Sequence, residues 1–143
     1  MVKYKTYVLK RMNMPFTIVF VRDNFDETLI EALNRVVNEI DKYLKNVEEK
    51  FSPFLPDSLV SKHTDIGEVL QEDFFDLEYQ EVYSRSIIAK KETHGLFNPF
   101  FGGKYNPTGF VKGWAIENAF MKYIKPLIDN NIIEAGAING AGD

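Results

Sequence analysis

One lysine stands among small residues in the stretch YNPTGFVKGW, residues 105–114. Thr108 is placed to cap a following helix, and Gly109 and Gly113 leave room for a ligand to approach the backbone. The free N–H groups at a helix N-terminus attract phosphate, and the Lys112 ammonium adds a point charge on a flexible stem. The stretch therefore fits a phosphate-binding helix start, although a capped helix with an exposed lysine is the more ordinary interpretation.

Two Phe-rich stretches offer surfaces for a planar ring. In LFNPFF, residues 96–101, apolar side chains surround Asn98, whose amide could fix the orientation of a bound ring. In FSPFLPDS, residues 51–58, Phe54 could stack on such a ring. Each stretch can equally be a loop that contributes to the core, and the residue types alone leave both interpretations open.

The sequence offers little for metal or nucleophilic chemistry. There is no cysteine, which excludes disulfides, thiolate metal sites and a cysteine nucleophile. His63 and His94 lack the spacing of a metal site, and the adjacent acids Glu72 and Asp73 are of the kind usually solvated at a surface. We find no pairing of a nucleophile with a base.

Composition indicates a single soluble globular domain over residues 1–143. Hydrophobic residues make up 45% and charged residues 27%, and the net charge of −4 is not that of a nucleic-acid binder. No apolar run approaches the roughly 20 residues that span a bilayer. The N-terminus lacks the apolar region of a secretory signal, so we expect a cytoplasmic protein.

The hydrophobic pattern predicts both strands and helices. We expect an α+β fold in which a mainly antiparallel sheet packs against helices. A capping box of Asn24 and Glu27 should precede the first helix, and Gly95 should end the second. The expected strands are residues 4–9, 16–21 and 133–138, and the expected helices are residues 29–51, 76–93 and 111–127.

Five segments, taken in order, resemble the ApbE family of flavin transferases, the FAD:protein FMN transferases. They are RMNMPFTI, FSPFLPDSLVSK, ETHGLFNPFFGG, NPTGFVKGWAIE and the terminal NGAGD. The resemblance runs from about Arg11 to Asp143 and covers only the N-terminal half of such a protein. It implies an ApbE-like, T-fold-like half with antiparallel sheet. The implied activity is Mg²⁺-dependent cleavage of FAD, with FMN passed to a Thr or Ser of a target flavoprotein and AMP released.

The resemblance also implies roles for individual residues. Met12 would contact the flavin nucleotide, and Phe54 takes the place of a ring-stacking tyrosine. Lys112 would reach the FAD phosphates, and the carbonyl of Gly109 would bind the metal. The remaining FAD contacts would come from Leu96, Phe97, Asn98 and Asn106.

The departures from the family pattern bear on activity. Asn98 and Asn106 stand where the family has aspartates, which removes two negative charges from the site. The family's side-chain metal ligands belong to its second half, so we expect weak or no transfer by this chain alone. The alternatives are a non-catalytic FAD or nucleotide binder, one half of a split enzyme that needs a complementing C-terminal half, and an interaction module that forms homo-oligomers.

Overall fold

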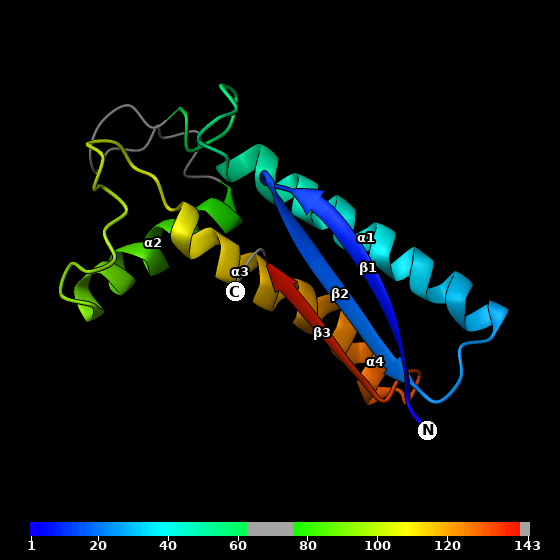
Figure 1. Ribbon diagram of the computed structural model, residues 1–143. Coiled ribbons are helices and arrows are strands. Elements are labelled where there is room, and N and C mark those ends of the chain that lie inside the picture. Colours follow the sequence, from blue (N-terminus) through cyan, green and yellow to red (C-terminus); the bar gives the residue numbers. More distant parts are fainter. Residues whose placement is uncertain (63–75, 141–143) are drawn as a thin grey trace. The chain divides into compact units, whose positions relative to one another are not determined.

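The computed structural model describes residues 1–62 and 76–140, which fall into two compact units (Figure 1). Unit 1 comprises residues 1–45 together with residues from 115 onward, and unit 2 comprises residues 46–114. His63, Glu72, Asp73 and the last three residues of the NGAGD segment lie outside the described residues. Each unit is described here by itself.

Unit 1 is built on a three-stranded antiparallel sheet in the order β1-β2-β3. The strands are β1 (Lys3–Arg11), β2 (Met14–Arg22) and β3 (Ala135–Gly140). Met12 and Asn13 form the two-residue turn between β1 and β2, with φ angles of 55° and 58°. Two positive φ angles in succession match the twist of the flanking strands, which is why such turns join tight hairpins. The three predicted strands and the antiparallel pairing are confirmed, although β3 begins and ends two residues later than the predicted range 133–138.

The two faces of the sheet differ in burial. Phe16, Ile18 and Phe20 alternate along β2 and are fully buried on the face that the helices of unit 1 cover (Figure 1). Across this face, Arg11 binds Asp41 of the first helix through two hydrogen bonds of 2.8 and 2.9 Å. Tyr4 and Val8 point to the opposite face, where both are exposed. The sheet therefore has one packed face and one open face.

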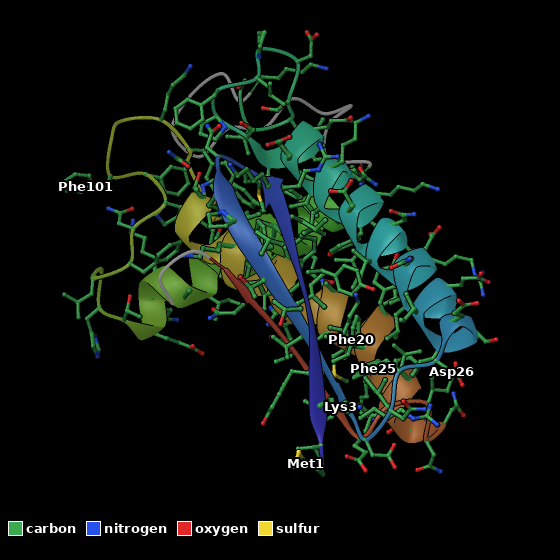
Figure 2. The ribbon with its side chains drawn as sticks, turned by 45° about the vertical axis from the view of Figure 1, so that its right-hand side comes forward. Met1, Lys3, Phe20, Phe25, Asp26 and Phe101 are labelled. Carbon is green, nitrogen blue, oxygen red and sulfur yellow. The ribbon has the colours of Figure 1, made fainter. Side chains whose placement is uncertain are left out.

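Helix α1 (Glu27–Phe51) carries the apolar stripe that its sequence predicts. Asp26 caps the helix, because its carboxylate accepts a 2.8 Å hydrogen bond from the backbone N–H of Leu29 (Figure 2). The expected cap at Asn24 is therefore wrong by two residues. Val36, which the pattern places in the stripe, is only half-buried. The buried members of the stripe are Leu29, Leu33, Val37, Ile40, Leu44, Val47 and Phe51.

The helix expected at residues 111–127 is instead three consecutive segments. They are α3 (Thr108–Ala119), the π-helical turn η2 (Phe120–Ile124) and α4 (Lys125–Asp129). Pro126 explains the wide turn, because its ring clashes with the carbonyl four residues earlier and it has no N–H to donate. The backbone N–H of Lys125 accordingly reaches the carbonyl of Phe120, five residues back.

In unit 2, helix α2 (Leu77–Glu92) has the boundaries that its sequence predicts. Asp76 caps its start by accepting from the N–H of Tyr79 at 2.9 Å, and Thr93 is its C-cap. His94 takes the left-handed φ of 54°, and the N–H of Gly95 then bonds the carbonyl of Lys90 at 2.9 Å. Gly95 thus helps to end the helix, as expected, but the first left-handed residue is a histidine.

Aromatic rings form the core of unit 2. Phe51 stacks on Tyr79 with the ring centroids 5.9 Å apart, and Trp114 meets Phe51 edge-on at 5.6 Å. Lys50 forms ion pairs with Glu78 at 2.6 Å and Asp76 at 3.0 Å. Burial acts to lower the pKa of Lys50, but the bonds to the two carboxylates outweigh burial and raise the pKa. These contacts tie the end of α1 to the start of α2.

Candidate functional site

The candidate residues from the sequence fall in both units. Met12 lies in unit 1, at the tip of the β1–β2 hairpin. The others, which are Phe54, Leu96, Phe97, Asn98, Asn106, Gly109 and Lys112, all belong to unit 2. Unit 2 therefore carries most of the expected FAD contacts on two loops and on the start of α3.

The loop after α2 holds Phe97 against the start of α3. The N–H of Phe97 donates to the Thr93 hydroxyl at 3.0 Å, which fixes the loop to the end of α2. A Cβ built on Gly109 would lie 3.5 Å from Cε1 of Phe97, so the ring touches this glycine. Leu96 beside it is 93% exposed. The structure thus brings Phe97 and Gly109 together and leaves Leu96 available to a ligand.

Both asparagines use their side-chain oxygens to order the backbone. Asn98 accepts from the N–H of Phe100 at 2.9 Å, which is a local Asx-type turn. Asn106 accepts from the N–H of Thr108 at 3.1 Å and also from the Thr108 hydroxyl. Asn106 therefore caps α3, whose first residue is Thr108. The expectation that Thr108 itself is the cap is wrong, because the helix begins earlier than its apolar pattern indicates.

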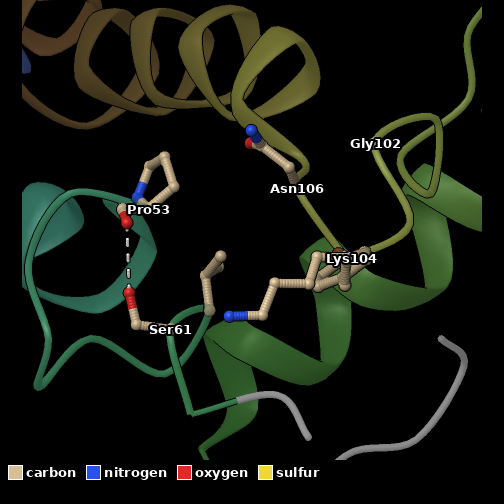
Figure 3. Close-up of a pocket in the computed structure, with 7 residues that line it drawn as sticks. Pro53, Ser61, Gly102, Lys104 and Asn106 are labelled. Carbon is tan, nitrogen blue, oxygen red and sulfur yellow. Dashed lines mark hydrogen bonds between the residues drawn. The ribbon is translucent and has the colours of Figure 1, made fainter. Parts of the chain in front are cut away.

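A hollow of about 220 Å³ lies between the loop after α1 and the loop before α3 (Figure 3). Asn106 is at its edge, and Pro53, the neighbour of Phe54, is on its wall. Phe54 does not line the hollow and is 77% exposed. Lys112 does not line it either and is half-buried on α3. The lining residues are Pro53, Val60, Ser61, Gly102, Lys104, Tyr105 and Asn106.

Tyr105 anchors the wall that carries Lys104 and Asn106. Its ring is buried and lies 5.1 Å from Tyr83 and 5.5 Å from Phe100, measured between centroids. Its hydroxyl lies 3.0 Å from that of Ser86, which donates its own proton to the carbonyl of Tyr83. Tyr105 must therefore be the donor to Ser86. Burial raises the pKa of Tyr105 far above its usual value, so the phenol stays protonated.

Hydrogen bonds within the opposite loop shape the other wall of the hollow. The Ser58 hydroxyl donates to the carbonyl of Ser52 at 2.6 Å, and the N–H of Ser61 donates to the Ser58 oxygen at 3.0 Å. The N–H of Leu59 bonds the carbonyl of Lys50 at 2.8 Å, which ties the loop to the end of α1. Because these hydrogen bonds order the loop, it offers a defined surface to a ligand.

Lys104 is the site residue that sequence reasoning missed. Its side chain runs across the hollow toward the loop that carries Ser61 (Figure 3). Among the described residues that line the hollow, Lys104 is the one charged residue, and none of them is Asp or Glu. A possible signal was the position of Lys104 next to Tyr105, because burying an aromatic side chain in an extended segment turns its two neighbours outward.

The described residues do not by themselves make up a site for Mg²⁺. Mg²⁺ prefers six oxygen ligands in octahedral geometry. Within residues 1–62 and 76–140, no three His, Cys, Asp or Glu side chains form a group that could hold a metal ion. The carbonyl of Gly109 lies in the first turn of α3 and could supply one ligand at most. The metal role of Gly109 stays a prediction.

Comparison with known proteins supports the fold through structure alone. No family model matches the sequence, and no curated protein matches it. The structure is similar to that of the flavin transferase ApbE from Vibrio cholerae, with a TM-score of 0.68 at 12% identity, over 97% of this chain and 57% of that one. A single-residue variant of the same protein gives a TM-score of 0.67 at 12% identity, over 96% and 60% of the two chains.

The likeness confirms the α+β fold expected from the resemblance to flavin transferases. The chain spans little more than half the length of the ApbE structure, with 57% of that chain covered. In the part of this chain that the structure describes, no helix has the length and apolar character needed to cross a membrane.

Proposed function

We propose that this chain carries the FAD-binding part of a flavin transferase. The complete activity would move FMN from FAD to a Thr or Ser hydroxyl of a target flavoprotein and release AMP. The observation that supports the proposal is the similarity of fold to a flavin transferase over 97% of this chain. The order of the five sequence segments points to the same family.

In this proposal, unit 2 holds the nucleotide on its two loops. Phe54 and Leu96 are both exposed, and in this proposal their apolar side chains would contact the flavin ring. Phe97 rests against Gly109 and so holds the loop after α2 against the start of α3. The hollow beside Asn106 would take a polar part of FAD, and Lys112 would approach the phosphates from α3.

The proposed reaction is a phosphoryl transfer. The acceptor oxygen bonds to the phosphorus of the FMN half, the bond from that phosphorus to the bridging oxygen breaks, and AMP leaves with that oxygen. The hydroxyl proton would pass to a base, and none of the candidate site residues of this chain is such a base. Mg²⁺, when bound, would neutralise charge on the phosphates. The residues of this chain would bind FAD and orient it, with the remaining metal ligands coming from a complementing half.

A second candidate is a non-catalytic binder of FAD or another nucleotide. Asn98 and Asn106 favour it, because each commits its side-chain oxygen to a backbone N–H and neither carries the charge of an aspartate. Such a protein binds FAD without Mg²⁺ and releases no AMP. The two candidates therefore differ in a measurable product.

The open face of the sheet in unit 1 is a candidate surface for binding a protein partner. Tyr4 and Val8 on β1 and Ala135 and Ala137 on β3 are exposed on this face. A complementing half or a second copy of the chain could cover such an apolar surface. Gel filtration of the isolated chain is the test, because a clean monomer at all concentrations would argue against self-association.

Titration with FAD, followed by flavin fluorescence, tests the proposed function. We expect fluorescence to change at micromolar protein, and we expect Phe97→Ala to weaken binding while Lys91→Ala, an exposed lysine at the end of α2, does not. No change at high micromolar protein would refute the FAD site. Transfer of FMN to a Thr-containing acceptor, measured with and without a supplied C-terminal half and lost in Lys112→Ala, would separate the transferase from the non-catalytic binder.

A further inference from the structure

We infer that the hollow between the two loops binds a phosphate group of the nucleotide directly, through the Lys104 ammonium and the Asn106 amide, without a metal ion. The inference rests on the proposed function in that the nucleotide is taken to be FAD. It assigns Lys104 a role that the resemblance to flavin transferases does not give it.

The orientation of the Asn106 amide follows from its hydrogen bonds. A backbone N–H can only donate, so the atom of Asn106 that meets the N–H of Thr108 must be the oxygen. Among the described residues the NH₂ group has no hydrogen-bond partner, so it can donate to a ligand. With aspartate at position 106, a second carboxylate oxygen would take the place of that donor.

The charges around the hollow favour an anion. The ammonium of Lys104 and the NH₂ group of Asn106 are donors, and none of the lining residues that the structure describes carries a negative charge. Pro53 and Val60 add apolar surface, which strengthens an electrostatic contact by excluding water. A phosphate group that the Lys104 ammonium and the Asn106 NH₂ group both reach would thus gain two hydrogen bonds, one of them assisted by charge.

The walls of this hollow are held in place before a ligand arrives. Tyr105 is buried between the two binding residues, and the N–H of Asn106 donates to the carbonyl of Pro99 at 2.6 Å. On the other side, Ser58 and Ser61 are bonded to each other at 3.0 Å. Binding therefore orders mainly the Lys104 side chain, which keeps the entropic cost small.

The inference predicts nucleotide binding that does not depend on a divalent cation. An aspartate at position 106 would repel phosphate unless a cation lay between them, whereas the asparagine needs no such bridge. Asn106→Asp should therefore weaken FAD binding in EDTA and partly regain affinity when Mg²⁺ is added. The wild-type chain should bind equally well in EDTA and in Mg²⁺.

The test is FAD titration of the full chain in EDTA, with Lys104→Ala, Asn106→Asp and the control Lys62→Ala. Lys62 is exposed, follows Ser61 directly and does not line the hollow, so its loss controls for net charge. We expect Lys104→Ala to weaken binding about tenfold, as for one charge-assisted hydrogen bond, and Lys62→Ala to bind as the wild type does. Circular dichroism checks that each variant is folded.

The outcomes separate this inference from the proposed function. FAD binding that needs Mg²⁺, or that is unchanged in Lys104→Ala, would overturn the inference and leave the FAD site standing. A second titration uses inorganic pyrophosphate, followed by amide shifts of residues 104 and 106 in NMR spectra. Pyrophosphate binding that depends on Lys104, in a chain that does not bind FAD, would support the anion site and refute the proposed function.

Discussion

The bond between Ser86 and Tyr105 should measurably stabilise unit 2. Both residues are buried, and the 3.0 Å bond between their hydroxyls is part of a chain that runs on to the carbonyl of Tyr83. Tyr105→Phe removes one hydroxyl, leaves the ring packing intact and should lower the free energy of unfolding by about 1 kcal/mol. The Ser86 hydroxyl still donates to the carbonyl of Tyr83 in this variant, which limits the loss of stability.

Ser86→Ala should cost more, because it removes two hydrogen bonds, the one that Tyr105 donates to Ser86 and the one that Ser86 donates to the carbonyl of Tyr83. Each lost bond costs about 1 kcal/mol, and the better helix propensity of alanine recovers up to about 0.5 kcal/mol. In the double variant the bond between the two hydroxyls is lost once and not twice, so its loss should be smaller than the sum of the two single losses. We expect a coupling energy of about 1 kcal/mol between the two positions.

Urea unfolding, monitored by circular dichroism, measures all four proteins of this cycle. The slope of the free energy against urea concentration should be unchanged, so that the midpoints report stability directly. Single effects that add to within about 0.3 kcal/mol would show that the two hydroxyls are not bonded and would refute the reasoning. The anchoring of Lys104 and Asn106 by Tyr105 would then need another explanation.

Three further predictions concern the stability of the fold. The hydrogen bond from Arg11 lowers the pKa of Asp41. The pair therefore stabilises the protein above about pH 4 and loses this effect as the pH falls through the lowered pKa. Asp41→Asn should remove this part of the acid dependence of unfolding. His94→Gly should raise the free energy of unfolding by about 0.5–1 kcal/mol, because glycine adopts the φ of 54° without strain; an unchanged urea midpoint would contradict it. Gly136→Ala should destabilise by about 1–3 kcal/mol in thermal melts, because the new Cβ would lie 2.7 Å from Cγ2 of the buried Ile124, and a melting temperature equal to that of the wild type would argue against this contact.

Periodicity predicted the elements that bury a regular apolar face. The stripe of α1 and the strands β1 and β2 follow directly from spacings of three to four and of two residues. The bounds of the helix after residue 107 were harder to predict, because its first turn carries no apolar repeat and Pro126 distorts its end into a π-helical turn. Caps depend on single side chains, which is why Asp26 and Asn106 rather than Asn24 and Thr108 fill these roles.

The sequence pointed to two loops of unit 2 as the candidate site, and this stays a prediction, but it did not point to Lys104. Resemblance drew attention to Asn106, and the structure shows that its oxygen is committed to capping α3. Lys104 escaped notice because no motif includes it. Its place on the hollow depends on the burial of Tyr105 next to it, which brings together residues from separate loops. Local patterns do not encode such contacts.

The central claim is that FAD binds the two loops of unit 2, and NMR shift mapping tests this claim directly. Amide signals of the ¹⁵N-labelled chain would be followed while FAD is added. The account predicts saturable shifts in residues 52–61 and 96–112, together with quenching or enhancement of flavin fluorescence at the same concentrations. Shifts that leave both loops unchanged while FAD binds, or the absence of any shift at high micromolar protein, would contradict it.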